Sequence, residues 1–136
     1  MNKLEKILGV PFPNKTIIIN ATNTTNKVKK NSIFFGLQGT QVHGSKYIEK
    51  ALDLGASIAV HDDPNFKSNL KNIFYVKNIA KSQNDSFKSS KLFFFLEELS
   101  GMKDKNFIIH AFTGTNGKTS SAFLCHQLIR KQRIKK

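Results

Sequence analysis

Short apolar runs alternate with polar, glycine-containing stretches along the first hundred residues. Runs rich in β-branched and aromatic residues predict strands at residues 16–20, 33–37, 57–60 and 73–76. Apolar residues at helical spacing predict helices at residues 2–9, 45–55 and 78–99. Between the first two strands, residues 21–32 are polar and predict a loop. This alternation indicates an α/β fold, with a small mixed or parallel sheet and flanking helices.

A second unit begins near the carboxyl end of the sequence. Residues 106–112 predict a strand, and a glycine-containing loop and a helical pattern follow it. We place the domain boundary near residues 101–105, with one domain over 1–103 and the start of another over 104–136. A strand, a glycine loop and a helix are the first parts of a nucleotide-binding α/β domain of the P-loop type.

The loop itself reads Gly114-Thr-Asn-Gly-Lys-Thr119. Its glycines let backbone N–H groups point at phosphate oxygens, and the following helix adds its positive amino end. Lys118 is placed to reach the terminal phosphates, and Thr119 to bind Mg2+. We therefore predict an ATP site formed by Gly114, Thr115, Asn116, Gly117, Lys118, Thr119 and Ser120, with ATP and Mg2+ as cofactors.

Two separated motifs carry a resemblance to a known family. The segment Thr113-Gly-Thr-Asn-Gly-Lys-Thr119 resembles the ATP loop of the Mur ligases, which add amino acids to UDP-N-acetylmuramoyl peptides in peptidoglycan synthesis. The stretch over residues 27–48, with Ala51 and the Gly55-Ala56 pair, resembles the UDP-binding domain at the amino end of those enzymes. The resemblance implies that residues 1–103 are a UDP-substrate-binding domain and that residues 104–136 begin the ATP-binding central domain.

The resemblance also implies residues for the UDP site. The family's His-Gln-Ala-like uridine contact falls on Thr40, Gln41 and Val42, of which Gln41 is identical. The family's Asp-Ser-Arg loop falls on residues 24–26, where Thr25 keeps a hydroxyl but the acid and the base are absent. The implied UDP-substrate-binding residues are Thr25, Thr40, Gln41 and Val42.

Within the family, the sequence is most similar to the ligases that add the third residue, diaminopimelate or lysine, to UDP-N-acetylmuramoyl-L-Ala-D-Glu. The D-alanyl-D-alanine-adding ligases are the alternative. The family's remaining catalytic parts correspond to sequence beyond residue 136, so we expect this chain alone to be inactive. We expect a truncated, split or partially recorded gene, with the remainder encoded separately as one option.

Composition leaves two other classes open. The net charge of +13 on 136 residues is typical of nucleic-acid binders, but only Arg130 and Arg133 of the 22 basic residues are Arg, and Lys is spread along the chain. A basic nucleic-acid-binding protein therefore stays an alternative, as does a non-catalytic module for a nucleotide or UDP-sugar. No stretch is apolar for the ~20 residues that span a bilayer, and we expect a cytoplasmic protein without a membrane partner.

Two smaller features are interpreted structurally. Asp62 and Asp63 precede Pro64 and are assigned to a turn. The Phe93-Phe-Phe95 run is assigned to the buried face of a helix.

Overall fold

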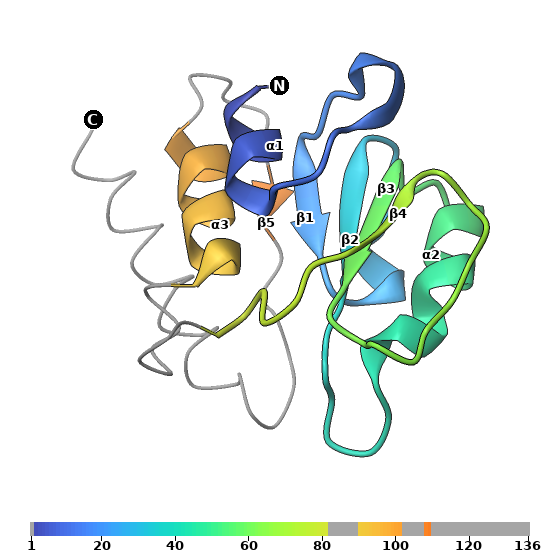
Figure 1. The fold of residues 1–136 in the computed structure, drawn as a ribbon. Helices are drawn as coiled ribbons and strands as arrows, with labels where there is room; N and C mark the ends of the chain where they lie inside the picture. The colour runs from blue at the N-terminus through green and yellow to red at the C-terminus, as the bar shows by residue number, and fades with distance from the viewer. Residues whose placement is uncertain (1, 82–89, 102–107, 110–136) are drawn as a thin grey trace.

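The computed structural model describes residues 2–81, 90–101 and 108–109. Its centre is a five-stranded sheet in the order β4-β3-β2-β1-β5, and every pairing between neighbours is parallel (Figure 1). The strands are β1 (Asn20–Thr22), β2 (Ser32–Gly36), β3 (Ile58–His61), β4 (Ile73–Tyr75) and β5 (Ile108–Ile109). The expected α/β class is confirmed, and the sheet is parallel rather than mixed.

Helices cover both faces of this sheet. In Figure 1, α1 (Lys3–Leu8) and α3 (Lys91–Gly101) lie together on one face, and α2 (Ile48–Asp53) lies on the other. Three 3-10 helices join these elements: η1 (Pro13–Lys15), η2 (Thr25–Lys27) and η3 (Gly44–Tyr47). Such coverage is what a parallel sheet needs, because both of its faces must be buried.

The alternation of side chains along β2 divides the core into two layers. Ile33 and Phe35 face α1 and α3, where Phe35 meets the ring of Phe95 edge-on with centroids 5.4 Å apart. Phe34 points to the opposite face and packs with Ile48 and other residues of the α2 layer. All five residues of β2 are buried, so this strand is the centre of the fold.

The first helix forms as its sequence predicts. The Asn2 side chain accepts a hydrogen bond from the Glu5 backbone N–H, and the Glu5 carboxylate accepts one from the Asn2 N–H. This reciprocal pair is a capping box, which satisfies two N–H groups that lack partners inside the helix. The predicted stop is also confirmed, since Gly9 takes a left-handed conformation with φ 75°.

The strands predicted at 33–37, 57–60 and 73–76 are confirmed within a residue or two, as is a strand within 106–112 at β5. The strand predicted at 16–20 is misplaced, because β1 spans Asn20–Thr22: it shares only Asn20 with the predicted strand and continues into the stretch expected to be a loop. Ile17 is instead 67% exposed. The apolar run misled the assignment, since the true strand buries the polar Asn20 and Thr22.

The helix predicted from residue 78 to residue 99 is also wrong at its start. Asn78 has φ 54°, a left-handed conformation, and residues 77–80 form a turn. The α3 helix begins at Lys91. Of the Phe93-Phe-Phe95 run, Phe95 is fully buried as expected, whereas Phe94 is 47% exposed.

Candidate functional site at the carboxyl edge of the sheet

The candidate site lies where β1, β2 and β3 end. Because the strands are parallel, their carboxyl ends share one edge of the sheet, the lower edge in Figure 1. The loops that follow β1 and β2 are therefore neighbours, and they carry the UDP-site residues implied by the sequence. Ligands of open parallel α/β sheets bind outside the carboxyl ends of the strands, where the strand order reverses, and in this sheet the order reverses beside β1.

The loop after β1 is held by hydrogen bonds from buried polar side chains of the sheet. Asn20 Nδ2 donates to Ser32 Oγ at 2.6 Å and to the Lys27 carbonyl at 3.2 Å. The Lys29 N–H donates to the same Ser32 Oγ at 2.9 Å. These bonds hold the carboxyl end of η2 and the chain that follows it. Thr25, the first residue of η2, is half-buried.

The start of this loop is set by a threonine turn. The Thr24 N–H donates to Thr22 Oγ1 at 3.1 Å, immediately after β1 ends. A hydroxyl that accepts from the backbone two residues on bends the chain without any glycine. The bend directs the chain into η2 at Thr25.

The loop after β2 is a narrow hairpin that presents the other three implied residues. The Gly39 N–H donates to the Val42 carbonyl at 3.1 Å, so Thr40 and Gln41 form its tip. A bridge between Gln38 and His43 closes the hairpin below this turn. Thr40, Gln41 and Val42 are all exposed, and the structure therefore brings them together at one surface position.

Glycines make the base of this hairpin possible. The Gly44 N–H donates to the Leu37 carbonyl at 2.6 Å. A Cβ at Gly44 would lie 2.7 Å from the Leu37 backbone, and one at Gly36 would lie 3.0 Å from the Ser45 backbone. The two ends of the loop are in direct backbone contact, which no larger residue permits without a shift.

The end of β3 supplies side chains that the sequence did not assign to the site. His43 Nε2 lies 2.8 Å from Asp62 Oδ1, and Ser45 Oγ donates to Asp63 Oδ2 at 2.7 Å. The turn expected at Asp62 and Asp63 is confirmed by the Asn65 N–H, which donates to Asp63 Oδ1 at 2.9 Å. The turn interpretation was incomplete, because each carboxylate also bonds a residue 18 or 19 positions earlier.

Two ionisable groups at this edge have shifted pKa values. Burial lowers the pKa of His61 below its ordinary value of 6.5, and the nearby Asp63 carboxylate only partly opposes this. The hydrogen bond from Ser45 lowers the pKa of Asp63, with a further contribution from the Asn65 N–H. The His61 ring packs against Phe66 and Tyr75, with centroids 4.9 Å and 5.6 Å away. The edge therefore favours neutral His61 beside ionised Asp63.

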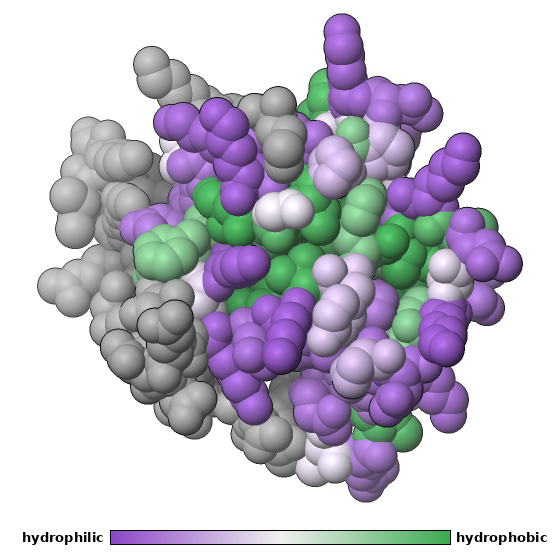
Figure 2. Space-filling model, viewed as in Figure 1, coloured by the Kyte–Doolittle hydropathy of each residue, from purple (hydrophilic) through white to green (hydrophobic). Residues whose placement is uncertain are grey.

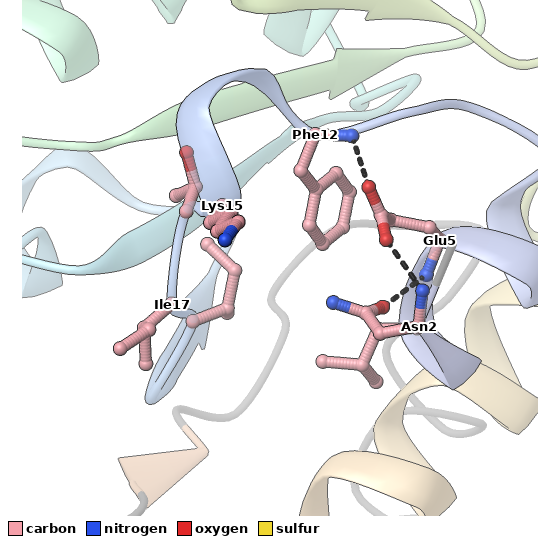
Figure 3. Close-up of a pocket in the computed structure, with 8 residues that line it drawn as sticks. Asn2, Glu5, Phe12, Lys15 and Ile17 are labelled. Atoms are coloured by element: carbon pink, nitrogen blue, oxygen red, sulfur yellow. Dashed lines mark hydrogen bonds between the residues drawn. The ribbon is translucent and has the colours of Figure 1, made fainter.

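A hollow of about 490 Å³ lies at the opposite end of the sheet, before β1. Figure 3 shows the Glu5 carboxylate in its wall, bonded to the N–H groups of Asn2 and Phe12 at 2.6 Å each. These bonds lower the pKa of Glu5, the Asn2 bond most. Both carboxylate oxygens of Glu5 therefore accept hydrogen bonds within the protein.

The described residues were also compared with the requirements of a membrane-spanning helix and of a metal site. On the face drawn in Figure 2, hydrophilic side chains surround a central apolar area. None of the helices within residues 2–81 and 90–101 has the length and apolar character to cross a bilayer. Across the described residues, no group of His, Cys, Asp and Glu side chains is arranged to hold a metal ion.

The implied ATP residues, Gly114 to Ser120, lie outside the described residues, as does Thr119 as the Mg2+ ligand. The ATP and Mg2+ site stays a prediction from the sequence.

Comparison with known proteins identifies the family of this chain. The sequence model described as the Mur ligase family, catalytic domain, matches residues 22–91, more than half of the chain. The chain therefore belongs to the Mur ligase family. The matched region contains η2, the hairpin after β2 and the end of β3.

Several curated members of that family are similar in sequence to this chain. The chain is 32% identical over 119 residues to a UDP-N-acetylmuramoyl-L-alanyl-D-glutamate--2,6-diaminopimelate ligase of Clostridium tetani (87% of this chain, 23% of the relative). It is 31% identical over 134 residues to the ligase of the same name from Clostridium botulinum (96% and 26%). A UDP-N-acetylmuramyl-tripeptide synthetase of Treponema pallidum is 30% identical over 103 residues (76% and 18%). The chain thus spans about a quarter or less of each of these relatives.

Proposed function

We propose that this chain is the UDP-substrate-binding part of a third-residue Mur ligase in peptidoglycan synthesis, together with the start of its ATP-binding domain. The observation that carries the proposal is the placement of two loops at one sheet edge. Thr25 follows β1 and Gln41 follows β2, and these strands are adjacent and parallel. Thr25 and Gln41, which are 16 positions apart in sequence, thus lie at the same edge of the sheet, as a shared ligand requires.

The side chains of Thr25, Thr40 and Gln41 suit a uridine diphosphate. The amide of Gln41 both donates and accepts hydrogen bonds, as the imide edge of uracil does. The hydroxyls of Thr25 and Thr40 can donate to phosphate or ribose oxygens. These residues supply recognition and orientation, and in our proposal they take no part in bond formation.

The names of the relatives support our assignment of the added residue and the substrate. Two of the curated relatives carry the name of the diaminopimelate-adding ligase, which specifies UDP-N-acetylmuramoyl-L-alanyl-D-glutamate as its substrate. We assign the same substrate to this chain. The D-alanyl-D-alanine-adding ligases remain the alternative, because their substrate carries the same UDP-N-acetylmuramoyl group.

The ATP part of the proposal rests on the sequence. Gly114 to Ser120 would hold the nucleotide phosphates, with Lys118 on the terminal phosphates and Thr119 on Mg2+. ATP, when bound, supplies the phosphoryl group that activates a carboxylate for amide formation. We expect the 136-residue chain to bind its substrates without joining them, since it spans about a quarter or less of the relatives.

Calorimetric titration tests the proposal directly. Purified chain is titrated with UDP-N-acetylmuramoyl-L-Ala-D-Glu, with UDP and with CDP. We expect saturable heat with both uridine ligands and a weaker response to CDP. The absence of heat with either uridine ligand would overturn the proposal. Retention of the chain on duplex DNA at ~0.15 M salt would instead favour the nucleic-acid alternative, because purely phosphate-driven affinity falls steeply with salt.

A further inference from the structure

Two side-chain pairs connect the hairpin after β2 to the end of β3. The first is His43 with Asp62, and the second is Ser45 with Asp63. The partners are 19 and 18 residues apart, and α2 lies between them in sequence. Neither pair includes a residue that the sequence assigned to ligand binding.

The hydrogen bonds of His43 determine how its ring is held. Its Nδ1 accepts from the Ser45 N–H at 3.1 Å, so this nitrogen carries no proton in the arrangement observed. The Nε2 atom then carries the proton and donates to Asp62 Oδ1 at 2.8 Å. Both ring nitrogens are occupied, which fixes the ring and leaves His43 unsuited to act as a general base.

The carboxylates are held from their own side as well. Asp63 accepts from the Asn65 N–H, and its own N–H donates to His61 Nδ1 at 3.2 Å. His61 belongs to β3 and is 4% exposed. The acceptors for the hairpin are therefore part of the rigid end of a central strand.

The two pairs lie on either side of the backbone contact at the base of the hairpin. Gly44 and Leu37 touch at its base, so a change of direction there would move the whole tip. His43 precedes that point and Ser45 follows it. With both residues bonded to β3, the direction of the exposed Thr40–Gln41 tip is fixed before any ligand arrives.

We propose that His43–Asp62 and Ser45–Asp63 are positioning pairs, which hold the hairpin in the direction that presents Gln41 to the uridine diphosphate part of the substrate. This inference rests on the proposed function. Its physical basis is preorganisation, because a loop that is ordered beforehand loses less conformational entropy on binding. Asp62 and Asp63 act through the hairpin and do not touch the ligand.

The test compares substrate affinity with fold stability. His43→Ala, Asp62→Ala and the double variant are titrated with UDP-N-acetylmuramoyl-L-Ala-D-Glu, and their thermal unfolding is recorded. We expect each single variant to bind about tenfold more weakly, and the double variant to bind no more weakly than either, because coupled residues are not additive. His43→Gln, whose amide can still donate to Asp62, should recover most of the affinity. Asp53→Ala, at an exposed carboxylate ending α2, is the matched control.

A second measurement separates positioning from general stability. Hydrogen exchange of the backbone N–H groups of residues 39–42 should become faster in His43→Ala, while exchange in β2 and β3 stays unchanged. Ser45→Ala, a smaller change, should have the same two effects if His43→Ala does not fold. Tight binding by wild type and equally tight binding by all variants would overturn the inference alone. No binding by wild type would overturn the proposed function, and the inference with it.

Discussion

Nδ2 of Asn20 donates a hydrogen bond of 2.6 Å to Oγ of Ser32, and this contact joins β1 to β2 at the residue pair where their register begins. Both side chains are buried, with 2% and 0% of their surface exposed. The same Ser32 oxygen accepts from Lys29 N–H, so one hydroxyl serves the sheet and the loop that carries Thr25.

Replacing Ser32 with Ala should therefore destabilise the protein out of proportion to the one atom removed. Asn20 Nδ2 would lose its shorter bond and the Lys29 N–H would lose its acceptor, at a cost of about 1–3 kcal/mol. The loss in the free energy of unfolding is measured by urea unfolding, with circular dichroism as the signal. Ser57→Ala is the control, because the Ser57 backbone N–H bonds the Ser32 carbonyl and is kept in the variant, while the Ser57 hydroxyl takes no part in the bonds to Asn20 and Lys29. An equal loss in both variants would contradict the argument.

Gln41 is the residue from which we expect the largest direct effect on ligand binding. Gln41→Ala should weaken binding of UDP-N-acetylmuramoyl-L-Ala-D-Glu by roughly three- to tenfold, as the loss of one or two hydrogen bonds implies. Thermal stability should not change, because the side chain is exposed. Gln38→Ala, another exposed glutamine of the same loop, should bind like wild type in the same calorimetric titration.

Lys118 tests the ATP loop. If Gly114 to Ser120 bind ATP, Mg-ATP should raise the midpoint of thermal unfolding of wild type, since a ligand that binds only the folded state stabilises it. Lys118→Ala should abolish this shift, whereas the exposed Lys77→Ala should preserve it. A shift of equal size in Lys118→Ala would show that the loop does not bind the nucleotide.

The lowered pKa of His61 predicts that the stability of the fold depends on pH. Its pKa is lowered in the folded state, so below pH 6.5 the unfolded chain binds more protons at this group than the folded chain does. The stability that neutral His61 provides is therefore complete above pH 6.5 and is lost as the pH falls through the folded pKa.

His61→Asn isolates this contribution, because its carbonyl oxygen can replace Nδ1 as acceptor for the Asp63 N–H. As the pH falls from about 7 to about 5, the midpoint temperature of thermal unfolding should decrease more steeply for wild type than for His61→Asn. Parallel curves for the two proteins would show that His61 titrates alike in both states.

Two neighbouring phenylalanines test the packing of α3. Phe95→Ala should cost about 3–5 kcal/mol, because it leaves a cavity beside Phe35. Phe94→Ala should cost much less, since that ring is 47% exposed. Both values come from urea unfolding, and similar losses would mean that α3 does not pack on the sheet as described.

The sequence predicted those elements that are stabilised by apolar burial, and it misplaced those that are stabilised by polar contacts or depend on a backbone conformation. The β2 strand was predicted almost to the residue, because Ile33, Phe34 and Phe35 are buried for their apolar character. The β1 strand was misplaced, because it is held by polar contacts of Asn20 that local sequence does not reveal. The start of α3 was missed because Asn78 can cap a helix and can equally take the left-handed conformation observed.

The candidate site could be predicted only in part for a similar reason. The tip residues Thr40 and Gln41 were proposed as ligand contacts through a family resemblance, and they stay a prediction; both lie at the turn of one hairpin. The pairing of His43 with Asp62 spans 19 residues and depends on strand order, which no local pattern encodes. One signal was available: polar residues that directly follow neighbouring parallel strands meet at the same edge.

The strand order has a consequence for synthesis on the ribosome. The strands β1 to β4 take adjacent places in the order in which they emerge, but the free side of β1 is paired only when Ile108 arrives. During that interval β1 is an open edge. It is three residues long and carries Asn20 and Thr22 in place of large apolar side chains, which discourages a second nascent chain from adding a strand there.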